Sequence, residues 1–347
     1  MLSYLKTLAK KLARTMLYIK ATSYRKLPKP AYKWASGMLM RIYNDNRMML
    51  HYYSHRMRIG VGFRELIKLL VKTAENHVLH ILGTSTSGIA PAATVAQLMK
   101  KKLLINHKGK FYIYENDLCS RNLIGLIKSW KPDAIVSTTP FAIPYGVQYA
   151  NALKTGFAYI RPGAKDHGKE KQIEGNLKKG MRIVLITCPS KEETWETIEK
   201  TESALKENGY EVVLVCKMED SFVHHRIVTS DELGGCNVVV IEDLFSTGGS
   251  AAYEVYQVRE AGAVCNYCFS IFSYGFDVLK KQFSGESMIG TKGVKLYTPC
   301  EIESLLPFDV LKSEMERMNF YTPSVRQSLA EEIDGFDKNY QEFLATS

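Results

Sequence analysis

Long apolar runs are missing from this sequence of 347 residues. No stretch approaches the roughly 18 uninterrupted apolar residues of a membrane-spanning helix, so we expect no integral membrane span. Hydrophobic residues make up 46% of the chain and charged residues 24%. That balance is typical of a globular protein, and a chain of this length can bury a substantial core.

Paired cysteine motifs are missing as well. The seven cysteines are odd in number and scattered. Buried thiols in apolar, strand-like runs favour a reducing compartment, so we expect a cytoplasmic protein. Such runs contain Cys188, Cys216, Cys265 and Cys268. The Cys265-x-x-Cys268 pair has no second CxxC or HxxxH partner, and on a strand its side chains face opposite ways. We therefore expect no metal bound by this pair.

Acidic residues are missing before Asp45, although the chain carries a net charge of +10. The basic residues of this end are Lys6, Lys10, Lys11, Arg14, Lys20, Arg25, Lys26, Lys29, Lys33 and Arg41. We favour a basic amphipathic helix and a connecting segment docked on the main domain. The alternatives are a polyanion-binding surface, an interfacial membrane helix and an organelle-targeting presequence. A secretory signal is not expected, because Lys10 and Lys11 interrupt the apolar segment.

Aromatic residues are interleaved with these basic residues: Tyr18, Tyr24, Tyr32, Trp34, Tyr43, Tyr52 and Tyr53. This pattern is compatible with a nucleic-acid surface. We favour a hood that packs on the core and covers a substrate, with no nucleic-acid partner.

Four apolar runs, each followed by a small-residue turn and a helical stretch, organise the chain from about residue 77 onward. The runs begin near Val78, Ala134, Arg182 and Val238, and the helices are expected at 90–101, 143–154, 191–208 and 249–262. Alternating strands and helices predict an α/β domain with a mostly parallel sheet covered by helices on both faces. Ligands bind such sheets at the carboxyl ends of the strands.

The four units resemble one another in pairs. Aligning Thr84 with Thr138 places Ile89 on Ile143 and Ala96 on Ala150. Aligning Ile186 with Ile241 superimposes the other two units. Repeated βα units are expected in any doubly wound domain, but each unit resembles its own partner best, which favours a duplication.

The segment NVVVIEDLFSTGGS, residues 237–250, combines two kinds of binding group. Its apolar strand ends at Glu242 and Asp243, and a turn of small residues then opens a helix. Glycines allow backbone N–H groups to point at one anion, and a helix N-terminus favours negative charge. The turn therefore predicts a phosphate site, and the carboxylates suit sugar hydroxyls. The alternative is a capped helix start with exposed acids.

This segment resembles the phosphoribosyl pyrophosphate (PRPP) signature of type I phosphoribosyltransferases, and the chain more narrowly resembles the orotate phosphoribosyltransferase family. The run 159–175, YIRPGAKDHGKEKQIEG, is similar to that family's mobile catalytic loop. The run 34–47, WASGMLMRIYNDNR, resembles its amino-terminal segment, and 269–276, FSIFSYGF, the strand end after its PRPP helix. The resemblance covers about residues 10 to 310.

The resemblance implies conversion of orotate and PRPP to orotidine 5′-monophosphate and pyrophosphate, with Mg²⁺, in a homodimer whose loop reaches into the neighbouring subunit's site. Arg161, Lys165 and His167 would stabilise the leaving pyrophosphate, and Asp243 would act beside the cationic ribose. The implied PRPP-binding residues are Glu242, Asp243, Leu244, Phe245, Ser246, Thr247, Gly248, Gly249 and Ser250. Ser246 is also the implied orotate contact.

Two turns compete for the pyrophosphate. The turn 83–88 has the better small-residue chemistry, but Ser137, Thr138 and Thr139 lead directly into the loop, as the family order requires. We lean to Ser137–Thr139 and leave the other turn open. The sequence also departs from the family where Pro162 stands in place of a second lysine, which removes one cation from the leaving-group side and affects the expected rate more than the activity.

The predicted organisation is a single α/β unit of the type I phosphoribosyltransferase fold with added segments. Residues 1–60 form the basic helix and hood, 61–310 the core with inserted βα units near 77–131 and 181–236, and 311–347 a C-terminal helix. The run 301–306, EIESLL, is also expected to be helical. Two alternatives to orotate chemistry are transfer to another base and a PRPP-sensing protein without turnover.

Overall fold

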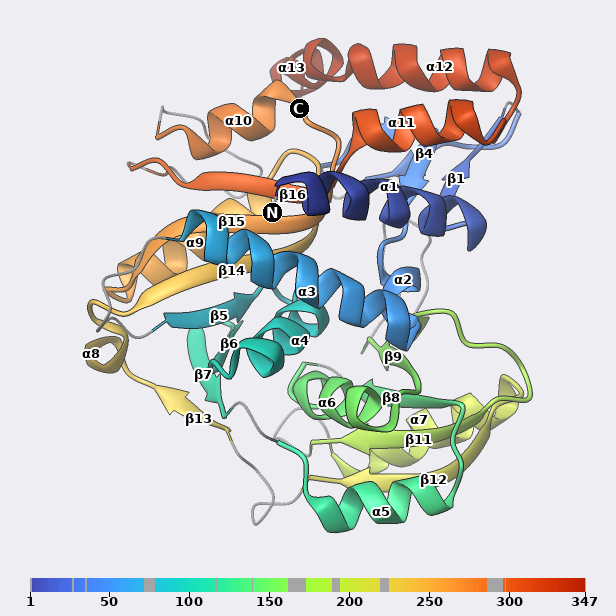
Figure 1. The fold of residues 1–347 in the computed structure, drawn as a ribbon, viewed down its shortest axis with the longest axis vertical. Coiled ribbons are helices and arrows are strands. Elements are labelled where there is room, and N and C mark those ends of the chain that lie inside the picture. The colour runs from blue at the N-terminus through green and yellow to red at the C-terminus, as the bar shows by residue number, and fades with distance from the viewer. Residues whose placement is uncertain are drawn as a thin grey trace.

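The computed structural model describes residues 2–346 apart from 27, 35, 72–78, 116–117, 139, 162–172, 189–193, 219–224, 286–295 and 297. Its strands form a seven-stranded sheet, a five-stranded sheet and two small two-stranded sheets. The two large sheets stand one above the other in Figure 1. We call the seven-stranded sheet and its helices the first lobe, and the five-stranded sheet and its helices the second lobe.

The first lobe has the strand order β13-β7-β6-β5-β14-β15-β16. Its strands are β5 (Leu79–Gly83), β6 (Leu103–His107), β7 (Lys110–Tyr114), β13 (His225–Val228), β14 (Asn237–Phe245), β15 (Val264–Ser273) and β16 (Glu301–Pro307). All neighbours from β6 to β16 pair in parallel, whereas β7 pairs antiparallel with both β6 and β13. The segment 77–131, predicted as an insertion, thus contributes the strand that lies beside β14.

The second lobe has the strand order β10-β9-β8-β11-β12. Its strands are β8 (Ala134–Thr138), β9 (Gly156–Ile160), β10 (Ile173–Glu174), β11 (Arg182–Thr187) and β12 (Glu211–Lys217). Only β10 is antiparallel to its neighbour. The mostly parallel architecture predicted from the sequence is confirmed, but it is divided between two sheets.

Helices cover both faces of each sheet. The helices that follow the four predicted apolar runs are α4 (Ile89–Met99), α6 (Ile143–Leu153), α7 (Trp195–Glu207) and α9 (Gly249–Glu260). Their bounds agree with the predicted helices within a few residues. Three further helices are α5 (Arg121–Ser129), α8 (Ser230–Leu233) and α10 (Asp277–Phe283).

Alternation along β14 explains how one strand supports two cores. Val239 and Ile241 belong to the large hydrophobic core that α4 also enters. Val238 and Val240 belong to a second core on the opposite face, shared with α9. Successive strand residues point to opposite faces, so an unbroken apolar run is what a strand covered on both sides requires.

The basic N-terminal end forms α1 (Leu2–Tyr18), whose buried face includes Leu8, Leu12 and Met16. It contacts α11 and β16, and Arg14 pairs with Glu314 at 2.8 Å. This placement agrees with the docked helix that we favoured. The hood that follows contains β1 (Thr22–Tyr24), β2 (Tyr32–Lys33), β3 (Leu39–Met40), β4 (Ile42–Asn44), α2 (Arg47–His51) and α3 (Tyr53–Leu70).

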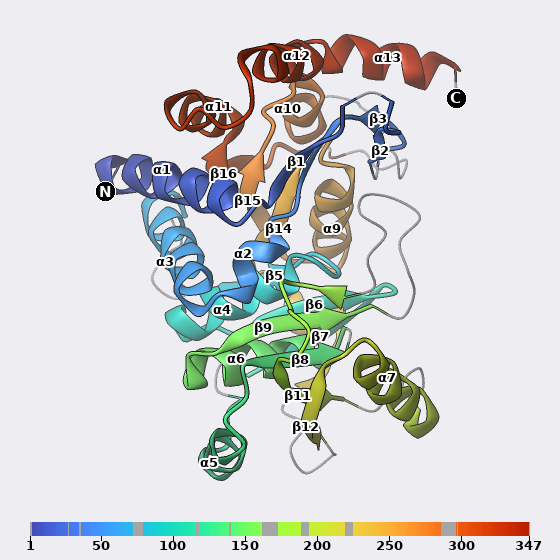
Figure 2. The ribbon, with the colours of Figure 1, turned by 90° about the vertical axis from the view of Figure 1, so that its right-hand side faces the viewer.

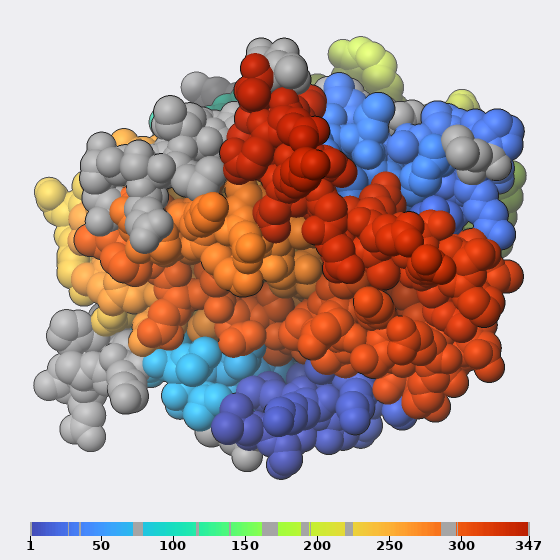
Figure 3. All heavy atoms as spheres, turned by 90° about the horizontal axis from the view of Figure 1, so that it is seen from above, coloured from blue at the N-terminus to red at the C-terminus, as the bar shows by residue number. Residues whose placement is uncertain are grey.

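The C-terminal region corrects two expectations. Residues 301–306 form the edge strand β16 and not a helix, because backbone pairing with β15 overrides their helix propensity. The single helix expected at 311–347 is three helices, α11 (Phe308–Arg317), α12 (Pro323–Asp334) and α13 (Phe336–Thr346). Figures 2 and 3 show these helices beside the N-terminal segments, where the Glu332 carboxylate accepts a hydrogen bond from the Arg41 backbone N–H at 2.6 Å.

Among the described residues, no helix combines the length and the apolar composition that crossing a membrane requires. This finding agrees with the absence of long apolar runs in the sequence.

Two buried histidines and one partly buried histidine predict a loss of stability at acidic pH. Burial lowers the pKa of His51, His80 and His225 to about 4. The folded protein therefore keeps these rings neutral, whereas the unfolded chain binds protons below about pH 6.5. The contribution of these neutral rings to the stability of the folded protein is complete above pH 6.5 and is lost as the pH falls towards 4. We expect a lower urea midpoint at pH 5 than at pH 7.

His225→Phe provides the matched comparison. The ring stacks on Tyr114 and Phe141, and phenylalanine can keep that packing without binding a proton. The variant should lose less of its urea midpoint between pH 7 and pH 5 than the wild type does. An equal loss would contradict the assignment.

Candidate functional site

The carboxyl end of β14 presents Glu242 and Asp243, and the turn 246–248 leads from it into α9. Gly248 has φ +81°, a left-handed conformation, and a Cβ there would lie 2.6 Å from the Cδ1 atom of Leu279. Only glycine meets both conditions without strain. The small-residue turn is therefore required by the geometry, which directs the first N–H groups of α9 towards the ends of the strands.

A second turn, residues 84–88, lies against the same strand end. The Thr84 N–H donates to the Ile241 carbonyl at 3.1 Å. A Cβ on Gly88 would lie 2.2 Å from that carbonyl oxygen. The Ser87 hydroxyl donates to Oε1 of Glu242 at 3.2 Å. The pairing of β5 with β14 thus brings two small-residue turns and two carboxylates together.

Glu242 is 6% exposed. Burial, together with the neighbouring charge of Asp243, raises the pKa of Glu242 well above its ordinary value. Its Oε1 also accepts a hydrogen bond from the Asp243 backbone N–H at 2.8 Å. Glu242 therefore favours its protonated form more than an exposed glutamate does.

Arg47, at the start of α2, links the hood to the carboxylates. Its Nε lies 3.1 Å from Oδ1 of Asp45 and 3.8 Å from Oδ2 of Asp243, and its Nη1 lies 2.9 Å from Oε1 of Glu174. It also donates to the hydroxyl of Tyr43. The guanidinium is 5% exposed. A buried cation of this kind attracts the Asp243 carboxylate and orients it.

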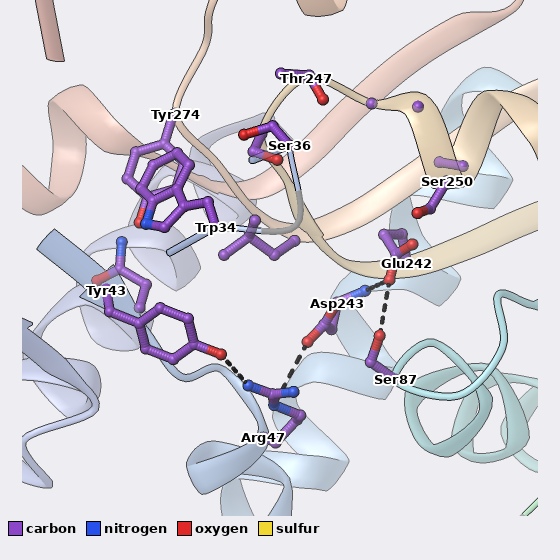
Figure 4. A pocket seen from close by; sticks show the side chains of 16 residues that line it. Trp34, Ser36, Tyr43, Arg47, Ser87, Glu242, Asp243, Thr247, Ser250 and Tyr274 are labelled. Carbon is purple, nitrogen blue, oxygen red and sulfur yellow. Dashed lines mark hydrogen bonds and ion pairs between the residues drawn. The ribbon is translucent and has the colours of Figure 1, made fainter. Parts of the chain in front are cut away.

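One pocket contains these groups, as Figure 4 shows. It is lined by Trp34, Ser36, Tyr43, Asn44, Arg47, Ser87, Glu242, Asp243, Leu244, Ser246, Thr247, Gly248, Gly249, Ser250, Ala251 and Tyr274. The rings of Trp34 and Tyr274 lie 4.6 Å apart and close the side opposite the carboxylates. The prediction that the N-terminal aromatics form a hood over a site is supported for Trp34 and Tyr43.

The structure brings most of the predicted PRPP-binding residues to this pocket, with Phe245 as the exception. Phe245 is 1% exposed and packs on Phe283, facing the second core. Ser246, the implied orotate contact, lines the pocket. Arg161 lies at its margin, where its Nε is 3.0 Å from Oε1 of Glu174.

Two other predicted residues, Ser137 and Thr138, are not brought to the pocket. Ser137 and Thr138 end β8 in the second lobe and do not line it. Thr139, Lys165 and His167 lie outside the described residues. Ser87 of the other candidate turn, 83–88, contacts Glu242.

Six residues of the pocket and its margin were not singled out from the sequence: Ser36, Asn44, Arg47, Glu174, Ala251 and Tyr274. All but Ala251 fall within the segments whose resemblance is described above, 34–47, 159–175 and 269–276. The signal was therefore present as segments, but nothing in the sequence showed which side chains turn inward.

Comparison with known proteins adds an independent observation. No family model matches the chain. An orotate phosphoribosyltransferase of Streptococcus sanguinis is 30% identical over 292 residues, which cover 84% of this chain and 82% of that protein. The chain belongs to the orotate phosphoribosyltransferase family.

Other relatives named orotate phosphoribosyltransferase show how the match is distributed. The protein of Staphylococcus saprophyticus is 26% identical over 309 residues, covering 89% of this chain and 92% of the relative. That of Streptococcus mutans is 33% identical over 180 residues, but this match covers only 52% of this chain and 57% of the relative. Against that relative and one of Lactococcus lactis, the match thus spans little more than half of the relative's length.

A solved orotate phosphoribosyltransferase of Mycobacterium tuberculosis has 14% identity and a TM-score of 0.35, covering 88% of this chain and 98% of that chain. That likeness is too low to support a conclusion. Membership of the orotate phosphoribosyltransferase family agrees with the mostly parallel sheets, the helices on both faces and the site at the strand ends.

Proposed function

We propose that this chain transfers a phosphoribosyl group from PRPP to orotate, giving orotidine 5′-monophosphate and pyrophosphate. The observation that carries the proposal is the pocket in which Glu242 and Asp243 stand between two small-residue turns, each suited to holding an anion. PRPP has phosphates at both ends of a ribose, and the pocket has the matching order of groups.

The residues of this chain would have the following roles in binding and catalysis. N–H groups of the turn 246–250 and the start of α9 hold the 5-phosphate. Glu242 and Asp243 hold the ribose hydroxyls, and the charge of Asp243 stabilises the positive ring that develops as pyrophosphate departs. Arg161 lies where it can meet the leaving group, and we keep Lys165 and His167 in that role on sequence grounds.

We place the pyrophosphate at the turn 84–88 in preference to Ser137–Thr139. Ser87 contacts Glu242, so an anion at this turn would adjoin the diol site. Ser246 remains the proposed orotate contact, with Trp34 and Tyr274 beside it to enclose the base.

The donors present fit Mg²⁺. No group of three or more His, Cys, Asp or Glu side chains suited to a metal occurs in the described part of the chain. Two adjacent carboxylates beside a phosphate site are nevertheless what Mg²⁺ needs, because it binds through one or two carboxylates, substrate oxygens and water. Glu242 and Asp243 would hold it, and it would neutralise charge on the pyrophosphate.

None of the seven cysteines, all of them in the described part of the chain, forms a disulfide, and five of them are buried. This state supports the cytoplasmic setting that we propose, where thiols remain reduced.

The decisive experiment follows orotate absorbance with purified protein, PRPP and Mg²⁺. We expect a decrease that depends on PRPP and on enzyme concentration. Uracil and purine bases, tested in parallel, would reveal transfer to another base. Binding of PRPP without turnover of any base would contradict the enzyme and favour the sensor.

A pair of serine variants tests the pyrophosphate turn. Ser87→Ala removes a hydroxyl that would donate to the bound pyrophosphate, and we expect about a tenfold rise in the KM for PRPP, since a hydrogen bond to a charged group contributes roughly 1.5 kcal/mol. Ser137→Ala should leave that KM unchanged. The reverse result would return the pyrophosphate to Ser137–Thr139.

A further inference from the structure

The two lobes have the same architecture at five strand positions. The order β7-β6-β5-β14-β15 of the first lobe matches β10-β9-β8-β11-β12 of the second, and each neighbouring pair has the same direction. The sequence pairing of Thr84 with Thr138 and of Ile241 with Ile186 predicts this match. The duplication expected from the sequence is thus supported by strand order.

The match extends to residue register. Gly83 pairs with Ile241 in the first lobe. The aligned residues Ser137 and Ile186 pair in the second. Gly83 likewise pairs with Ile105, and Ser137 with Tyr159. Register in a sheet is strongly specified, so two unrelated βα arrays are not expected to share it.

The helices at the boundary between the lobes are equivalent to each other. Helices α4 and α6 both contain 11 residues, and each ends on a lysine in the left-handed conformation, Lys100 and Lys154. They contact one another, and Asn151 donates to the side-chain oxygen of Gln97 at 2.9 Å. Gln97 and Asn151 occupy the same position in the two helices, and a contact between equivalent residues is the mark of a two-fold interface.

Each lobe retains only part of a site. The first lobe has Glu242 and Asp243, but its β6–β7 hairpin is closed by a tight turn at Lys108 and Gly109, with φ +53° and +80°. The second lobe has Thr187 and Cys188 at the positions of the two carboxylates, but between β9 and β10 it carries the segment 161–172, which begins with Arg161.

The two parts meet across the boundary. Oε1 of Glu174, on β10 of the second lobe, lies 3.0 Å from Nε of Arg161 and 2.9 Å from Nη1 of Arg47. Arg47 in turn lies 3.8 Å from Asp243 of the first lobe. A continuous chain of charged groups therefore joins the strand ends of the second lobe to the carboxylates of the first.

Aromatic rings fill the equivalent place on the other side of the boundary, where the β6–β7 hairpin of the first lobe contacts the turn after β8 of the second lobe. Phe141, the equivalent of Ser87, lies 4.8 Å from the ring of Tyr112 and 5.1 Å from that of His107, both in the hairpin of the first lobe. His225 stacks on Phe141 and hydrogen-bonds the Tyr145 hydroxyl at 3.0 Å. The hairpin of the first lobe thus contacts the turn of the second lobe through aromatic rings, whereas β10 of the second lobe reaches the carboxylates of the first through Arg47.

We propose that one chain contains both halves of a two-fold dimer: the second lobe takes the place of a partner subunit and contributes Arg161 to a single active site, whose carboxylates come from the first lobe. The chain is then complete as a monomer, in place of the homodimer expected from the sequence, and binds one PRPP. This proposal rests on the proposed function.

Complementation between variants tests it. One chain carries Arg161→Ala and a first tag, and a second chain carries Asp243→Asn and a different tag. The two chains are co-expressed. One portion is purified through both tags in turn, and another portion is kept as an unselected mixture. We expect only the sum of the two residual activities in the unselected mixture. If the site were shared between chains, random pairing would restore about one quarter of wild-type activity, and such recovery would overturn the proposal.

Two measurements on the wild type do not depend on turnover. Sedimentation should give the mass of one chain, 39.3 kDa, and calorimetric titration with PRPP and Mg²⁺ should give one site per chain. Two sites per chain, or activity confined to a dimer fraction, would contradict the proposal. An inactive wild type that is monomeric with one PRPP site would refute the proposed function but leave the lobe arrangement intact.

Discussion

Asp243→Asn is expected to lower kcat/KM for PRPP by at least about 100-fold, the size of effect seen when one preorganised electrostatic group is removed. The side chain is 13% exposed, lines the pocket and lies 3.8 Å from Arg47. The amide keeps the shape of the carboxylate but removes the negative charge that faces the developing positive ribose. Steady-state kinetics with varied PRPP measures the effect.

Asp334→Asn is the matched control, because Asp334 is exposed near the end of α12, away from the pocket residues. It should show wild-type kinetics. Unfolding curves of both variants distinguish a lost charge from a damaged fold. Wild-type kinetics in a folded Asp243→Asn protein would remove this residue from the site.

Arg47→Met is expected to lower the free energy of unfolding by about 3–5 kcal/mol, the usual effect of removing one partner from a buried ion pair. Asp45, Glu174 and Asp243 all face this guanidinium, and Arg47 and Glu174 are no more than 5% exposed. Without Arg47, these carboxylates lose their compensating charge. Urea unfolding at pH 7 measures the change.

Arg14→Met serves as the control. Arg14 also pairs with a carboxylate, that of Glu314, but its side chain is 47% exposed. Solvent screens such a pair, so its loss should leave the urea midpoint nearly unchanged. If Arg47→Met shifted the midpoint no more than Arg14→Met does, the charge network would not be a major source of stability.

The division of the strands between two sheets could not be predicted from local patterns. The runs near Ala134 and Arg182 have the same apolar character as those near Val78 and Val238, and hydrophobicity does not identify the partner of a strand. Backbone pairing decided it: β8 pairs with β11, and β5 pairs with β14. The same pairing decided which of the two candidate turns lies beside Glu242.

Glu174 shows a second limit of prediction from the sequence. In the sequence it is one acid in a polar stretch, yet it is 4% exposed, accepts a hydrogen bond from Arg47 and forms an ion pair with Arg161. Its role depends on the approach of β10 to the hood, which involves residues far apart in the sequence. The C-terminal edge strand β16 is similar, because its conformation follows from pairing with β15.

The sequence by itself determined the alternation of strands and helices, the resemblance to a family and the strand end that carries Glu242 and Asp243. These features depend on local periodicity, on the conformational freedom of glycine and on the spacing of polar groups within one segment. The tertiary structure alone decided which strands are neighbours, that Arg47 joins the two lobes, and that one of the two equivalent positions contains aromatic rings. These depend on hydrogen bonds and burial between distant segments, for which the local sequence contains no corresponding pattern.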